Sequence, residues 1–166
     1  MKAAAYTCQR VLAIAPSKRG FGFAVLEGPN ELIDWGTREA KREKNTKCLR
    51  QIAFLIERYS PDVVVIENHR DRSCRRSARI RELLEGIAAL AFSKRAKLRR
   101  IPRSALKKVF SQFCATGKHQ LAIEISKRFP ELAAHVPPPR KPWMTQVARM
   151  SMFDAVAIAL TFESGN

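Results

Sequence analysis

The hydrophobic pattern of the chain centres on Val63–Glu67, where four β-branched apolar residues are followed by a glutamate. Turn-forming residues precede this run and polar residues follow it, which is typical of a short strand buried on both faces. Such burial predicts a parallel or mixed sheet with helices on each side. Glu67 ends the strand at the edge where open α/β sheets tend to bind ligands. A strand that simply meets solvent would place a glutamate there as well, so position alone assigns no role.

Three shorter apolar runs precede this strand. They lie at 10–15, 21–26 and 31–37 and are separated by turn-forming segments at 16–20 and 27–30. Turns this short join neighbouring antiparallel strands. The beginning of the chain therefore predicts a three-stranded antiparallel meander.

Apolar residues recur at helical spacing from Leu49 to Tyr59, with Thr46 as a candidate N-cap. A helix here returns the chain to Val63–Glu67, and such a crossover makes that strand parallel to its neighbour. The second half of the chain is predicted to be mainly helical. Its predicted elements are helices at 80–91, 104–113, 118–129 and 147–162, a weak edge strand at 97–102, and an irregular proline-rich segment at 135–143.

Charge adds a function class to this α/β pattern. The 166 residues predict one domain, residues 1–166, with a core of its own. A net charge of +16 attracts polyanions, chiefly nucleic acid or an acidic membrane surface, although charge can also serve solubility alone.

Four scattered cysteines indicate neither a zinc site nor a disulfide framework and fit a reducing compartment. No signal peptide or apolar run of membrane-spanning length is apparent, so a cytoplasmic location is predicted.

The densest positive charge follows Glu67 directly. Residues 70–81 hold six arginines against one aspartate. Arginine presents a fork of donors to phosphate oxygens, which favours nucleic-acid contact over a merely solvated charge run. Two more cations lie in the turn at 16–20. The candidate contacts in these segments are Lys18, Arg19, Arg70, Arg72, Arg75, Arg76 and Arg79.

The predicted order of elements resembles the RNase H-like fold, and more closely its RuvC branch of Holliday junction resolvases. Leu12–Gly22 resembles the opening of that family, and Val64–Glu67 resembles the strand that delivers its glutamate. Ser151–Leu160 resembles its last helix, in which two aspartates three residues apart precede Ala-x-Ala-Ile-Ala. The resemblance runs from Val11 to Phe162. It implies a five-stranded mixed sheet, with three antiparallel strands and then parallel strands, flanked by helices.

The resemblance also implies a site, from which this sequence departs. Family members hold two divalent ions with four carboxylates, and the ions activate water and stabilise the leaving oxygen. Only Glu67 and Asp154 are carried over as catalytic and metal-binding residues, since Ala15 and Ser151 occupy the other two positions. The expected cofactor is Mg²⁺ or Mn²⁺, with one weakly held ion at most. The resemblance adds two phosphate-facing lysines to the candidate contacts, Lys107 and Lys118.

Some of these residues fit a structural role equally well. Asp154 could be the N-cap of a shorter helix that begins at Ala155. His69 is expected on the strand face of Glu67, where it could serve as a base or ligand, but a lone histidine beside arginines is also a common phosphate contact. Glu27 and Asp34 are acids that could replace a missing ligand.

Three functions are therefore distinguished. The first is a RuvC-like protein that binds nucleic acid, recognises structured or branched DNA, and has weakened or lost metal-dependent endonuclease activity. The second is an active divalent-metal-dependent endodeoxyribonuclease, similar to a junction resolvase, that uses Glu67 and Asp154 with His69 and a nearby acid. The third is a non-catalytic protein-interaction module. A homodimer is expected by analogy with the family alone.

Overall fold

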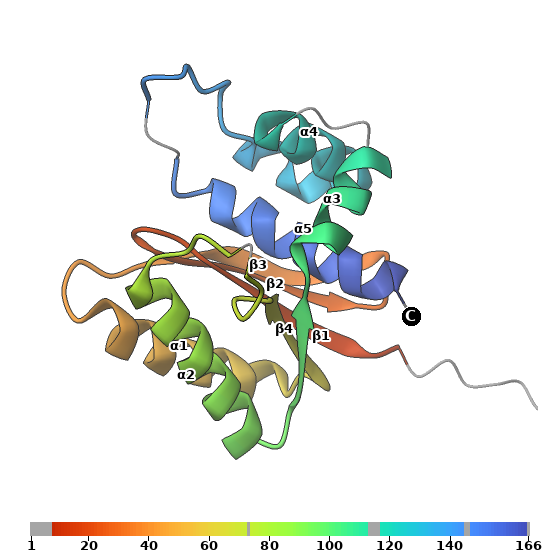
Figure 1. Cartoon of the computed structure of the whole chain (residues 1–166). Coiled ribbons are helices and arrows are strands. Elements are labelled where there is room, and N and C mark those ends of the chain that lie inside the picture. Colours follow the sequence, from red (N-terminus) through yellow and green to blue (C-terminus); the bar gives the residue numbers. More distant parts are fainter. Residues whose placement is uncertain (1–7, 73, 113–116, 145–146, 166) are drawn as a thin grey trace, which may run out of the picture.

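The computed structural model describes residues 8–72, 74–112, 117–144 and 147–165, and a five-stranded mixed sheet lies at its centre (Figure 1). The strands are arranged in the order β3-β2-β1-β4-β5. They are β1 (Arg10–Pro16), β2 (Gly20–Glu27), β3 (Glu31–Glu39), β4 (Val63–Glu67) and β5 (Lys97–Ile101). The first three form an antiparallel meander, whereas β4 is parallel to β1 and β5 is parallel to β4. The predicted mixed sheet is confirmed, β4 has the predicted bounds, and β5 is an edge strand.

Helices cover both faces of the sheet. They are α1 (Lys44–Tyr59), α2 (Ala78–Ser93), α3 (Arg103–Gln112), α4 (Lys118–Arg128), the 3₁₀ helix η1 (Pro130–His135) and α5 (Met150–Ser164). The helices α1 and α2 lie side by side on one face, and α5 crosses the other face beneath α3 and α4 (Figure 1). No helix among the described residues is long and apolar enough to cross a bilayer.

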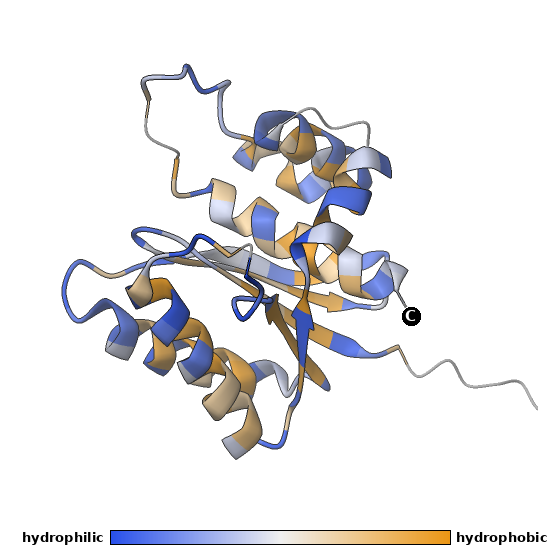
Figure 2. Cartoon of the chain, viewed as in Figure 1, coloured by the Kyte–Doolittle hydropathy of each residue, from blue (hydrophilic) through white to orange (hydrophobic). Residues whose placement is uncertain are grey.

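Alternation along the strands divides the apolar residues between two cores. Val63 and Val65 of β4 pack in the core that contains α5, whereas Val64 and Ile66 pack in the core beneath α1 and α2. All four side chains are at most 1% exposed. Burying each one stabilises the fold by about 1.5–3 kcal/mol relative to leaving it in water. Hydrophobic residues recur along α5, α1 and α2, and hydrophilic residues alternate with them on α1 and α2 (Figure 2).

The helix α5 is apolar on nearly all sides because it lies between the sheet and two other helices. Of its 15 residues, 12 are buried. It begins at Met150, whereas the sequence predicted a start at residue 147. Asp154 lies inside this helix, so its interpretation as an N-cap is wrong. The predicted N-cap Thr46 is also wrong, because α1 begins at Lys44.

The backbone of α5 rests directly on β2 at Gly22, the register partner of Ala15 on β1. A Cβ atom at Gly22 would lie 2.1 Å from the carbonyl carbon of Ser151 and 2.4 Å from the backbone nitrogen of Met152. A side chain at this position would therefore push the helix off the sheet. Because Gly22 has no side chain, α5 can contact the strands that carry the candidate site.

Replacing Gly22 with alanine is expected to lower the free energy of unfolding by about 3 kcal/mol, because the added methyl group overlaps the helix backbone. Urea denaturation measures this change. Gly165→Ala is the control, since its Cβ would meet its nearest atoms at 3.7 Å, and its effect is expected to stay within about 0.5 kcal/mol. Equal effects of the two substitutions would contradict the close packing.

Candidate functional site

A cavity of about 670 Å³ opens at the carboxyl ends of β1 and β4. Its walls come from these strands, the end of β5, the segment that follows β4, the helices α3 and α5, and the start of α4. Ala15, Glu67 and Asp154 all line it. Five cations also line it, namely Arg75, Arg76, Arg103, Lys107 and Lys118. Residues from distant parts of the chain thus meet at the edge where the sequence predicted a site.

The fold explains why Glu67 and Asp154 share this cavity. Glu67 follows Val63 and Val65 at alternate positions of β4, and those two side chains pack toward α5. Asp154 is the partly exposed residue in the otherwise buried first turns of α5. The carboxylates are 19% and 23% exposed. The structure thus brings the two predicted carboxylates together, while their catalytic role stays a prediction.

Each carboxylate is already paired with a cation of the chain. Nε of Arg76 lies 2.8 Å from Oε1 of Glu67, in an ion pair without hydrogen-bond alignment. Nζ of Lys118 donates to Oδ2 of Asp154 at 3.0 Å. The sequence predicted Arg76 and Lys118 as phosphate contacts and gave no sign of these pairs, because the partners lie on different elements and no short spacing signals them.

The two positions without carboxylates carry no substitute ligand. Ala15 is 2% exposed and offers only a methyl group to the cavity. Ser151 is buried, and its hydroxyl donates to the backbone oxygen of Ala148 at 2.8 Å. Within the described residues, no three His, Cys, Asp or Glu side chains come together in a group able to hold a metal ion. The site therefore does not fit two divalent ions, which require more hard oxygen ligands than these.

The acids considered as replacements lie elsewhere. Glu27 pairs with Arg10 at the start of β1, and Asp34 accepts a hydrogen bond from Tyr59. Neither acid lines the cavity. Burial, together with the hydrogen bond to Asp34, raises the pKa of the Tyr59 hydroxyl. These acids make contacts elsewhere in the fold and do not complete the candidate site.

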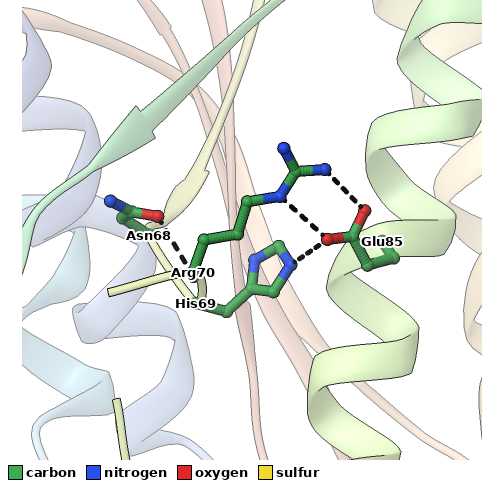
Figure 3. Close-up of polar contacts among 4 residues, drawn as sticks. All are labelled: Asn68, His69, Arg70 and Glu85. Atoms are coloured by element: carbon green, nitrogen blue, oxygen red, sulfur yellow. Dashed lines mark hydrogen bonds and ion pairs between the residues drawn. The ribbon is translucent and has the colours of Figure 1, made fainter. Parts of the chain in front are cut away.

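His69 contacts the helix α2, whereas Asp154 lies on α5. Its Nε2 lies 2.6 Å from Oε1 of Glu85 on α2, and Arg70 donates to both oxygens of the same carboxylate at 3.0 and 3.2 Å (Figure 3). Asn68 supports the turn by accepting a hydrogen bond from the backbone N–H of Arg70. The expectation that His69 shares the face of Glu67 is wrong, because α2 lies on the opposite face of the sheet from α5. Glu85 was not predicted, since in the sequence it looks like any exposed helix acid.

The Glu85 contacts predict a pH dependence of stability. Hydrogen bonds from Arg70, and secondly from His69, lower the pKa of Glu85 from about 4.5 to about 2. A lowered folded-state pKa gives stability that is complete above pH 4.5 and is lost as pH falls toward 2. Glu85→Gln is expected to remove this pH-dependent stability. The loss should be less than about 1 kcal/mol, because the carboxylate is half exposed. Thermal unfolding between these pH values measures this stability, with a substitution of the exposed Glu82, Glu82→Gln, as control. The same loss in both variants would contradict the role given to Glu85.

The structure separates the nine predicted cations into groups. Arg75, Arg76, Lys107 and Lys118 line the cavity, together with Arg103, which was not predicted. Arg70 is paired with Glu85. Lys18, Arg19 and Arg72 are exposed and lie outside the cavity lining.

Arg79 is committed within the protein. Its Nη2 donates to the backbone oxygens of Ser17 at 2.9 Å and Lys18 at 3.3 Å, and its Nη1 donates to Asn45 at 3.2 Å. These bonds tie the start of α2 to the turn between β1 and β2. Arg79 thereby positions the turn that presents Lys18 and Arg19.

Comparisons with known proteins bear on the fold. No family model and no curated protein sequence matches the chain. Among solved structures, Thermus thermophilus RuvC in complex with a Holliday junction substrate is similar with a TM-score of 0.65 and 16% identity over 92% of this chain and 91% of that chain. The yeast mitochondrial Holliday junction resolvase has a TM-score of 0.62 and 16% identity over 95% of this chain and 79% of that chain. The fowlpox virus resolvase in complex with its Holliday junction has a TM-score of 0.56 and 15% identity over 94% of this chain and 97% of that chain. These likenesses show that the chain has the RuvC-like variant of the RNase H-like fold.

Proposed function

We propose that this protein binds nucleic acid, recognises structured or branched DNA, and has weakened or lost metal-dependent endonuclease activity. The observation that carries the proposal is the cavity, where the chain's own cations pair with the two remaining carboxylates. Two of the similar structures, from T. thermophilus and fowlpox virus, are described as complexes with Holliday junctions, which supports a branched DNA partner. We propose that residues 1–166 act as one domain in this role.

Charge supports a polyanionic partner. The chain carries +16 overall, and five cations line a cavity that contains two carboxylates. Arginine guanidinium groups bind phosphate oxygens in pairs, and lysine ammonium groups bind them as point charges. Arg75, Arg103 and Lys107 are exposed at the cavity, so a DNA backbone can reach them.

The divalent-metal requirement of the fold family transfers only weakly to this site. An Mg²⁺ or Mn²⁺ ion would have to displace Arg76 from Glu67 or Lys118 from Asp154. Without carboxylates at positions 15 and 151, the donor set is too small for a second ion. We therefore propose that the site holds one ion at most, and weakly.

A second function has one observation in its favour. Glu67 and Asp154 line the same cavity at the strand ends, as an endonuclease that uses these two acids requires. Glu67→Gln separates the two functions. In an active endonuclease this substitution abolishes cleavage of a junction, whereas a protein that only binds has no cleavage to lose.

Binding of a labelled four-way DNA junction tests the proposal directly. Contact with about six phosphates is expected to lose about a thousandfold in affinity between about 50 and 200 mM salt. Fluorescence anisotropy with unlabelled duplex DNA and RNA as competitors measures both the salt slope and the preference for branches. Absence of binding at low salt would contradict the proposal and favour a protein-interaction module.

A homodimer is a further part of the proposal, by analogy with the family. Phe54 on α1 and Phe92 on α2 are 58% and 86% exposed, and this layer lies on the other face of the sheet from α5. Aromatic side chains are enriched at protein–protein interfaces, so we propose this helix layer as the contact between two copies. Sedimentation equilibrium is expected to show a dimer that Phe54→Ser with Phe92→Ser dissociates; an unchanged mass in the variant would contradict this interface. The cytoplasmic location stays a prediction.

A further inference from the structure

We propose that Arg76 and Lys118 replace divalent ions as the counter-charges of Glu67 and Asp154, so that the cavity binds a nucleic-acid phosphate without metal. This inference rests on the proposed function and deepens it, because it states how the same site holds its ligand. It also accounts for the mismatch between the fold, which implies metal ions, and the residues, which do not fit them.

The two ion pairs are the first support. Both carboxylates are about four-fifths buried, with 19% and 23% of their side chains exposed, and each has a cation of the chain at 2.8 or 3.0 Å. A partly buried carboxylate without a counter-charge is unfavourable, because it has lost much of its hydration. Arg76 and Lys118 supply that charge in the folded protein. The carboxylates therefore need no metal ion for neutralisation.

The charge that remains in the cavity is the second support. Five lining cations less two lining carboxylates leave a net charge of +3. Arg103 and Lys107, on the first two turns of α3, make no ion pair within the part of the chain that the structure describes. Arg75 is exposed beside Arg76. A metal-bound phosphate would meet two ions, whereas here the phosphate meets arginine and lysine donors directly.

This arrangement reverses the expected effect of removing the acids. In a metal site supplied with Mg²⁺, Glu67 and Asp154 would hold the ion that attracts phosphate, so neutral substitutions would weaken binding. In the arrangement proposed here, the same carboxylates repel phosphate and occupy Arg76 and Lys118. Neutral substitutions then free two cations for the ligand and strengthen binding. In Mg²⁺, the sign of the change distinguishes the two mechanisms without any measurement of cleavage, whereas in EDTA both mechanisms give tighter binding because two negative charges are removed.

The experiment measures affinity of the full chain for a labelled four-way DNA junction, in EDTA and in Mg²⁺ at equal ionic strength. For the wild type, the two affinities are expected to agree within about twofold. Combining Glu67→Gln with Asp154→Asn is expected to tighten binding between about threefold and a hundredfold at about 0.1 M salt, since each freed cation adds up to one phosphate contact. The control combines Glu31→Gln with Glu82→Gln, which changes the net charge equally at exposed positions outside the cavity and is expected to tighten binding less.

The outcomes separate this inference from the proposed function. Weaker binding by the cavity variant in Mg²⁺, or wild-type binding that requires Mg²⁺, overturns the inference and leaves nucleic-acid binding intact. Equal tightening by the cavity variant and its control also overturns it. If wild type and variants all fail to bind at low salt, the proposed function fails as well. Glu67→Gln and Asp154→Asn are also measured singly, with thermal unfolding of each protein, so that misfolding of the double variant does not decide the result.

Discussion

Replacing Arg75, Arg103 and Lys107 with alanine is expected to weaken binding of a four-way DNA junction about a thousandfold at about 0.1 M salt. These side chains line the cavity, whereas Glu67 and Asp154 are paired with Arg76 and Lys118. Each lost phosphate contact costs nearly tenfold at this salt concentration and lowers the salt slope by about 0.9. The salt slope of the triple variant should therefore be shallower by the contribution of about three phosphate contacts.

A matched control separates the cavity from the overall charge. Lys47, Arg50 and Arg58 are exposed on α1, in the layer beneath the opposite face of the sheet. Replacing these three with alanine lowers the net charge from +16 by the same three units. We expect this variant to lose much less affinity. Equal losses in the two variants would show that binding depends on the overall field of the protein and would contradict a defined phosphate site.

Restoring two carboxylates is expected to produce the second large effect. A variant with Ala15→Asp and Ser151→Asp is expected to cleave the junction in Mn²⁺ at least about tenfold faster than the wild type, a difference of about 1.4 kcal/mol in activation free energy. Ala15 lines the cavity with Glu67 and Asp154, and position 151 lies one helical turn before Asp154. Four acids supply the hard oxygen ligands that the wild type lacks.

This prediction is checked by single-turnover cleavage and by Mn²⁺ binding in calorimetry. The triple variant that also carries Glu67→Gln is the control, and it is expected to lose the new cleavage. Thermal unfolding shows whether a carboxylate is tolerated at position 151, where the native serine is buried. A folded double variant that binds Mn²⁺ no better than the wild type would contradict the assignment of Ala15 and Ser151 as the missing ligand positions.

Local patterns predicted most of the fold. Val63–Glu67 is a continuous β-branched run between turn residues, and it forms β4 with those bounds. The turns on either side of β2 are too short for anything except antiparallel neighbours, and the meander is confirmed. Helix starts were predicted less well, because Glu43 before α1 has a left-handed backbone and makes no side-chain cap hydrogen bond. Nothing in residue type signals such a start.

The pairing of charges could not be predicted from the sequence. Arg70, Arg76 and Arg79 follow Glu67 in one arginine-rich segment, yet they bind Glu85, Glu67 and the turn at Ser17 respectively. These contacts depend on which elements pack together, and local spacing carries no information about them. The candidate carboxylates were identified through family resemblance, whereas their counter-ions required the folded arrangement.

Binding and cleavage measured in one sample decide most directly whether this protein is a nuclease or a binder. The wild-type protein is incubated with a labelled four-way DNA junction in Mn²⁺, beside Glu67→Gln. We predict that the wild type binds the junction and cleaves it weakly or not at all, because its two cavity carboxylates are neutralised by Arg76 and Lys118. Cleavage by the wild type as fast as that of the Ala15→Asp, Ser151→Asp variant, abolished by Glu67→Gln, would contradict this prediction and show a working nuclease.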